Sequence, residues 1–123
     1  MSVPRIVFVV PGLLAGLLIP AVVSPHSAPP NTVGMIGTLF AKDTVWIHQG
    51  QELTLYNSST LVHVIGPGWD QHVYSPQRGN PVTGFHLMAT DGTYTTPPWM
   101  TVGKFTLTCT VHPGMNLTVI VVR

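Results

Sequence analysis

Short runs of β-branched and aromatic residues, separated by turn-forming residues, fill the chain from Thr32 to its last residue. This spacing is typical of a β-sandwich, in which short strands are joined by tight turns. The 12 glycines and 12 prolines, together with the lack of long Ala-, Leu-, Glu- and Lys-rich stretches, exclude a helix bundle. A chain of 123 residues has room for one folded domain. The sequence therefore predicts an all-β sandwich.

The predicted strands are unevenly distributed along the chain. Six runs have the composition and length of strands: 33–40, 44–48, 52–56, 60–65, 103–110 and 116–122. Residues 66–98 are rich in Gly, Pro, Asn and Asp, so this stretch is predicted to be mostly loop, with 83–90 as its candidate strand. In the fifth run, alternation places Phe105, Leu107 and Cys109 on one face. Cys109 is therefore predicted to point into the core at the end of a buried strand.

The N-terminal segment has the layout of an export signal. Arg5 precedes an apolar run over residues 6–23, and a Pro- and Ser-rich stretch follows over residues 24–30. A removed signal peptide and a retained membrane anchor both stay open, because the run is at the lower limit of bilayer-spanning length. We divide the chain into residues 1–30, the signal or anchor with a short linker, and residues 31–123, the folded domain. We expect an extracytoplasmic location, either periplasmic or secreted and at the cell surface.

Charged side chains are rare, with five Lys and Arg and four Asp and Glu. No basic stripe can neutralise a run of phosphates, so nucleic-acid binding is excluded. Without Arg5, four basic and four acidic side chains remain, and the folded domain has a formal net charge of zero. Docking to partner proteins should therefore be mainly apolar, and we expect a monomer.

One loop concentrates side chains that bind metals. Cys109 is followed by His112 and Met115, with Pro113 and Gly114 between them. One Cys, two His and a weak axial Met form a donor set that serves copper in both its Cu(I) and Cu(II) states. Alone, Cys109 would be interpreted as an inert buried residue and Met115 as a core side chain. The joint spacing favours a metal site, which then needs a second histidine.

His63 is the preferred second histidine, at the end of the predicted strand 60–65. Its separation from the cysteine is long enough to cross the sandwich, and a strand end holds a ligand more rigidly than a loop does. The competing interpretations are that His63 is a core histidine bonded to a backbone carbonyl, or that His72 in the following loop is the ligand instead. His48 and His86 are predicted to be structural or surface residues.

Together these motifs resemble the cupredoxins, the small blue-copper proteins that include plastocyanin, azurin, pseudoazurin and amicyanin. The resemblance spans residues 33–123 and is most specific over 103–115, which is similar to the family's Gly-x-Tyr/Phe lead-in and Cys-x-x-His-x-x-Met ligand loop. The two-residue gap before Met115 is the short form, closest to that of amicyanin. Residues 57–63 resemble the family's Asn-x5-His arrangement.

The resemblance implies a Greek-key β-sandwich that binds one copper ion through His63, Cys109, His112 and Met115. It implies an electron carrier that passes one electron between extracytoplasmic redox partner proteins, which dock on an apolar patch around His112. Copper delivery or storage is the alternative that the sequence leaves open. Val64 is a departure, because several members have Asn, Ser or Thr after the first histidine, where the side chain ties the two ligand loops together.

The sequence argues against an enzyme. Multicopper oxidases and nitrite reductases need His-x-His pairs and a His beside the Cys to build a second copper centre. Here Thr108 and Thr110 flank Cys109, and no His-x-His occurs. A binuclear centre of the respiratory oxidase kind needs two cysteines, and this chain has one. We therefore expect no substrate to be transformed.

Overall fold

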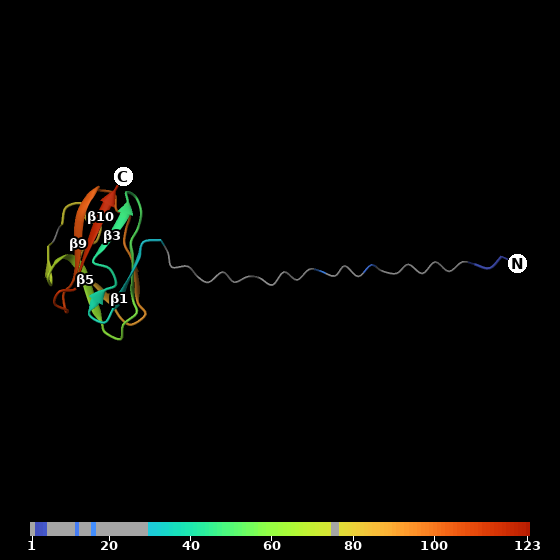
Figure 1. Ribbon diagram of the computed structural model, residues 1–123, viewed down its shortest axis with the longest axis horizontal. Coiled ribbons are helices and arrows are strands. Elements are labelled where there is room, and N and C mark those ends of the chain that lie inside the picture. The colour runs from blue at the N-terminus through green and yellow to red at the C-terminus, as the bar shows by residue number, and fades with distance from the viewer. Residues whose placement is uncertain (1, 5–11, 13–15, 17–29, 75–76) are drawn as a thin grey trace.

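The computed structural model describes residues 2–4, 12, 16, 30–74 and 77–123. The predicted leader over residues 6–23 lies outside the described residues except at positions 12 and 16. In the described part of the chain, no helix is long and apolar enough to cross a membrane. The regular structure of that part consists of β-strands (Figure 1).

The strands form two mixed sheets. The first has the order β2-β1-β4-β8 and contains β1 (Thr32–Ile36), β2 (Leu39–Phe40), β4 (Thr54–Asn57) and β8 (Thr93–Thr95). The second has the order β3-β10-β9-β5-β6, with β7 paired to β5, and contains β3 (Thr44–His48), β5 (His63–Trp69), β6 (His72–Val73), β7 (His86–Met88), β9 (Gly103–Cys109) and β10 (Asn116–Val122). Two pairs, β1 with β4 and β3 with β10, are parallel. The prediction of an all-β sandwich is confirmed.

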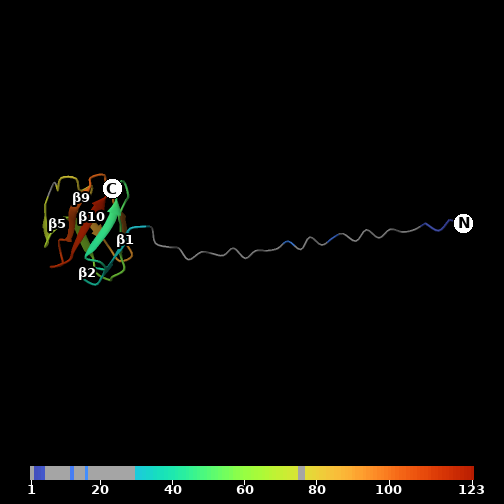
Figure 2. The same ribbon diagram turned by 45° about the horizontal axis from the view of Figure 1, so that its top comes forward.

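The apolar core lies between the two sheets. It includes Met35 and Leu55 from the first sheet and Ile47, Leu107 and Leu117 from the second, and these five side chains are almost completely buried. Burial of this kind contributes about 1.5–3 kcal/mol for each large aliphatic side chain. Figure 2 shows the same strands turned by 45°, with β9 and β10 side by side. The central hairpin of the second sheet therefore supplies much of the inner face.

Strand β9 has the predicted alternation. Phe105, Leu107 and Cys109 are buried on one face, and Cys109 is the last residue of the strand. Trp99 precedes this strand and is completely buried, with its ring 5.6 Å from that of Phe105. The indole N–H of Trp99 donates to Thr96 Oγ1 over 2.9 Å, so this buried polar atom is satisfied. The prediction that the cysteine points into the core is confirmed.

The predicted strand over residues 33–40 is instead two strands. β1 ends at Ile36 and β2 begins at Leu39, and the two pair in antiparallel fashion across a tight turn. Gly37 has φ = 56° in this turn, a backbone conformation that glycine adopts without steric cost. The sequence pattern predicts one strand because the turn residues, Gly37 and Thr38, interrupt the apolar run only briefly.

Strand β5 differs most from its prediction, which placed a strand over residues 60–65. It begins at His63 and continues to Trp69, so part of the predicted loop 66–98 is a strand. The β6 hairpin folds closely back on β5 at two glycines. A Cβ at Gly66 would lie 3.1 Å from the Val73 side chain, which would have to shift, and a Cβ at Gly68 would overlap the His72 carbonyl, so glycine is required at position 68. The remaining loop also contains β6, β7 and β8, and β7 lies within the candidate strand 83–90.

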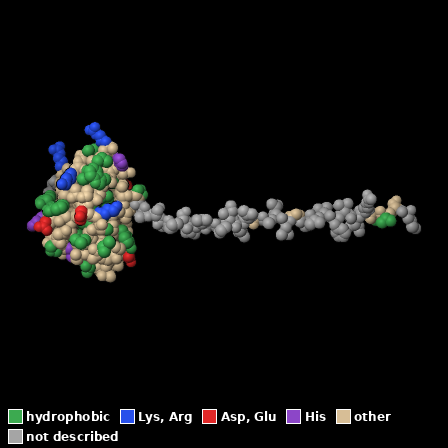
Figure 3. Space-filling model, viewed as in Figure 1, with side chains coloured by type: hydrophobic (Ala, Val, Ile, Leu, Met, Phe, Trp, Pro, Cys, Tyr) green, Lys and Arg blue, Asp and Glu red, His purple; other side chains and the backbone are tan. Residues whose placement is uncertain are grey.

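Charged side chains are spread over the visible surface in Figure 3, with both signs present and no large cluster of either. The apolar side chains on this face are scattered among polar ones. This distribution agrees with the balanced charge of residues 31–123.

Candidate metal centre

A short loop joins β9 to β10 and contains His112. The backbone N–H of Cys109 donates to the Met115 carbonyl over 3.0 Å, and the N–H of Met115 donates to the His112 carbonyl over 3.4 Å. Gly114, with φ = 72°, supplies the left-handed residue that the tight return of the chain requires. The hairpin register then continues as a regular ladder, with Thr108 opposite Asn116. The chain thus brings Cys109, His112 and Met115 into one compact unit.

The second element of the site is the beginning of β5, which lies beside β9 in the same sheet. Ile65 is the cross-strand partner of Cys109. The Val64 carbonyl accepts the backbone N–H of Thr110 over 2.9 Å and its hydroxyl over 3.4 Å. His63 and Cys109 therefore lie at neighbouring strand ends of one sheet, and the chain between them passes through β8 of the other sheet.

The same contacts join the two ligand loops, although no polar side chain follows His63. The backbone carbonyl of Val64 accepts hydrogen bonds from both the N–H and the hydroxyl of Thr110. A hairpin tip adds further support, since the Gln71 side chain donates to the Thr110 carbonyl over 3.0 Å and its backbone N–H donates to Thr108 Oγ1 over 3.0 Å. The end of β9 is thereby held from two sides.

Three side chains converge at this point. One donor atom each of His63, Cys109 and His112 lie within 4.8 Å of one another. The Cys109 Sγ is 3.8 Å from His63 Nδ1 and 3.4 Å from His112 Nδ1, and the two imidazole rings are tilted by 57°. This is a cysteine sulfur flanked by two imidazoles, a donor set suited to copper or zinc.

Burial distinguishes the members of the site. His63, Cys109 and Met115 are fully buried, whereas His112 is half-buried. Burial lowers the pKa of His63, the positive charge of a protonated His112 lowers it further, and a backbone hydrogen bond with Gly37 opposes these effects. His63 is therefore kept neutral, which is the state that a metal ligand requires.

The other histidines lie away from this cluster. His72 is exposed on β6, where it pairs with Trp69, and it does not belong to the metal-ligating group found among the described residues. His48 is exposed, with Nδ1 3.2 Å from the carbonyl oxygen of Arg123. His86 is stacked on Tyr94, with ring centroids 3.9 Å apart.

No sequence pattern indicates the role of Ser59. This buried serine lies with its Oγ 3.0 Å from His63 Nε2. Asn57, the first residue of the Asn-x5-His arrangement, is also buried, and its side-chain nitrogen donates to the carbonyls of Leu61, Met88 and Ala89. The segment between β4 and β5 is thus organised around the ring of His63.

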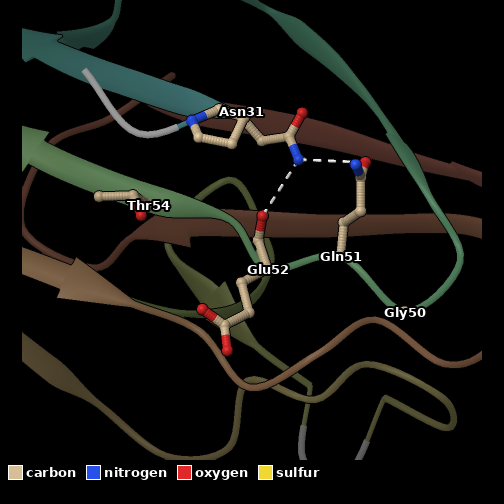
Figure 4. A pocket seen from close by; sticks show the side chains of 6 residues that line it. Asn31, Gly50, Gln51, Glu52 and Thr54 are labelled. Carbon is tan, nitrogen blue, oxygen red and sulfur yellow. Dashed lines mark hydrogen bonds between the residues drawn. The ribbon is translucent and has the colours of Figure 1, made fainter. Parts of the chain in front are cut away.

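A surface pocket lies beside the beginnings of β1 and β4 (Figure 4). It is lined by Pro30, Asn31, Gly50, Gln51, Glu52 and Thr54. The Asn31 side chain donates to Gln51 Oε1 over 3.2 Å and to the Glu52 carbonyl over 3.3 Å. These polar groups already have partners within the chain, and no metal-ligating cluster includes them in the described residues.

Comparison with known proteins gives structural neighbours only. No family model and no curated protein matches the sequence. Amicyanin from Paracoccus versutus (Thiobacillus versutus) superposes with a TM-score of 0.62 at 22% identity, covering 80% of this chain and 85% of that protein. A reduced Cu(I) form of an amicyanin mutant at pH 4 gives 0.59 at 16% identity, covering 79% and 87%. A second mutant in the Cu(I) state gives 0.59 at 15%, with the same coverages. The chain therefore has the cupredoxin fold of the amicyanins.

Proposed function

We propose that this chain is a single-site blue-copper electron-transfer protein. The observation that carries the proposal is the convergence of His63, Cys109 and His112 in a fold shared with amicyanins that have been captured as Cu(I) forms. We assign the three side chains as the planar ligands and Met115 as the weak axial ligand. The folded domain comprises residues 31–123, and residues 1–30 form the leader.

The residues present fit a copper ion. A thiolate and a thioether are soft donors, and imidazole is borderline, so the set favours copper over the hard cations. Cys109 and His63 are shielded from water, and burial keeps His63 in its neutral form. A bound copper ion would supply one-electron chemistry between Cu(I) and Cu(II).

The protein's own contribution is a site that changes little as the electron arrives and leaves. Cys109 is fixed by the β9 ladder and by its backbone bond to Met115. The Val64 carbonyl, bonded to Thr110, fixes the spacing between β5 and β9. Rigid positioning of the ligands lowers the reorganisation that accompanies electron transfer.

His112 provides the route to the surface. It is the half-buried member of the cluster, and its neighbours Val111, Pro113 and Gly114 are exposed and uncharged. We call Val111, His112, Pro113 and Gly114 the rim. An apolar rim can be desolvated at low cost when a redox protein docks, so we assign electron entry and exit to His112. The partners are redox proteins outside the cytoplasm, the chain acts as a monomer, and no substrate is transformed.

Optical and electron paramagnetic resonance spectra of the purified protein with one equivalent of Cu(II) test the proposal. We expect an intense blue colour from thiolate-to-copper charge transfer, together with a narrow copper hyperfine splitting. The Cys109→Ser variant should lose the colour. A pale wild-type protein with ordinary wide splitting would contradict the trigonal site and would favour copper delivery or storage.

A further inference from the structure

The two ring nitrogens of His63 face different surroundings. Nδ1 faces the Cys109 Sγ at 3.8 Å, on the side where the metal ligands converge. Nε2 faces the Ser59 Oγ at 3.0 Å, and both residues are buried. In a neutral imidazole only one nitrogen carries a proton, so the direction of the Ser59–His63 hydrogen bond decides which nitrogen is free.

The orientation of the Asn57 amide is the first step in fixing that direction. Its nitrogen lies 2.8 Å from the Leu61 carbonyl, 3.0 Å from that of Met88 and 3.1 Å from that of Ala89. Its oxygen accepts the backbone N–H of Ser59 over 2.9 Å. Turning the amide around would place its oxygen against three acceptors, so the oxygen must be the atom that faces Ser59.

The hydroxyl proton of Ser59 follows from this orientation. Ser59 Oγ is 2.7 Å from Asn57 Oδ1, and two oxygens at that distance need a proton between them. Because the amide oxygen has none, Ser59 donates. The Leu61 carbonyl, at 3.3 Å, is a longer second acceptor. The Ser59 oxygen is then left to accept hydrogen bonds from Leu61 N–H at 3.2 Å and from His63 Nε2 at 3.0 Å.

We propose that Asn57 and Ser59 form a relay that holds His63 as the Nε2–H tautomer, so that the Nδ1 lone pair is directed at the metal position before any metal arrives. Ser59 is thereby a positioning residue, acting through His63. Partners of this kind orient a ligating histidine, and their loss costs about 10- to 100-fold in metal affinity. The tautomer does not depend on the proposed function; its effect on copper affinity does.

The first test is nitrogen-15 NMR of the His63 ring in the metal-free wild-type protein. The proposal requires a protonated Nε2 with slowed solvent exchange and an unprotonated Nδ1. A ring protonated on Nδ1 would overturn it, whether or not any variant folds. This measurement needs no copper, so it stands apart from the blue-copper assignment.

The second test compares Ser59→Ala with Ser58→Ala. Ser58 is the matched control, because its hydroxyl donates to the Met35 carbonyl over 2.8 Å and does not contact His63. In Ser59→Ala we expect faster exchange of the Nε2 proton and a Cu(I) affinity lowered about tenfold or more. Ser59→Thr, which keeps the hydroxyl, should restore both. Ser58→Ala should leave both unchanged.

If Ser59→Ala keeps the wild-type exchange rate and Cu(I) affinity, the backbone contact with Gly37 is sufficient to hold the ring, and the relay is wrong. A wild-type protein that shows the expected tautomer but binds no copper would instead refute the proposed function and leave the relay intact.

Discussion

His63 and His112 present the same imidazole to Cys109 in different surroundings. His63 is completely buried, bonded at its far nitrogen and held on a strand. His112 lies in the β9–β10 loop with part of its ring exposed. The first is therefore suited to anchoring a metal ion and the second to passing an electron outward. This division follows from the surroundings of the two rings, because their chemistry is identical.

The two competing histidines can be separated at the residue scale. His63→Ala removes a donor 3.8 Å from the Cys109 sulfur, so the protein should lose the blue site when loaded with Cu(II). His72→Ala should keep it, because His72 is exposed and outside the cluster. Both variants are loaded identically and compared by their optical spectra. A blue His63→Ala protein and a colourless His72→Ala protein would reverse the assignment.

Met115→Leu tests the axial position. The exchange conserves volume, so this buried site should lose less than about 1.5 kcal/mol of stability. The blue colour should persist because the thiolate stays. The reduction potential should rise, because loss of a weak donor destabilises Cu(II) more than Cu(I). Voltammetry of the variant and the wild type measures the difference, and equal potentials would show that Met115 is not an axial ligand.

At the scale of elements, β9 could be predicted from its local sequence, whereas the extent of β5 depends on residues that are distant in the chain. The inner face of β9 could be predicted, since Phe105, Leu107 and Cys109 alternate with polar residues and all three are buried. The extent of β5 could not. Its Gly-Pro-Gly sequence is typical of a turn, and non-local pairing with β9 on one side and with the β6 hairpin on the other keeps it extended.

The residues of the candidate metal centre differ in the same way, because some are indicated by local spacing and others depend on non-local contacts. Cys109, His112 and Met115 belong to one loop, so their spacing alone indicates a site. The approach of His63 depends on the pairing of β5 with β9, which is non-local. The role of Ser59 depends on the orientation of a ring and an amide, which no spacing encodes.

Gly68→Ala tests the close packing of the β5–β6 hairpin. A Cβ at this position would overlap the His72 carbonyl, so the hairpin must move and Gln71 must lose its bonds to β9 and the metal loop. We expect a loss of more than about 2 kcal/mol, measured by urea unfolding. The control is Gly34→Ala, where the nearest atoms would be 3.9 Å away or farther; that loss should stay near or below about 1 kcal/mol. Similar losses in the two variants would contradict the close packing.

At the scale of the whole molecule, the balance of charge determines how strongly copies and partners attract or repel one another before contact. Residues 31–123 carry four basic and four acidic side chains, and both signs are present on the face drawn in Figure 3. Without a net charge on this part of the chain, long-range steering is weak. We therefore expect contact at the proposed docking rim to depend on shape and apolar burial.

Electron self-exchange between the Cu(I) and Cu(II) forms measures that contact without an identified partner. The rate, obtained from NMR line broadening, should change little between low and physiological salt, because no charged face is being screened.

Pro113→Asp should lower the self-exchange rate by placing like charges face to face, and added salt should recover part of the loss. Pro113 is the better position, since a side chain at Gly114 would be strained at φ = 72°. Pro98→Asp, at an exposed proline outside the rim, is the control and should match the wild type. A steep salt dependence in the wild type, or a Pro113→Asp rate equal to that of the control, would place the docking face elsewhere.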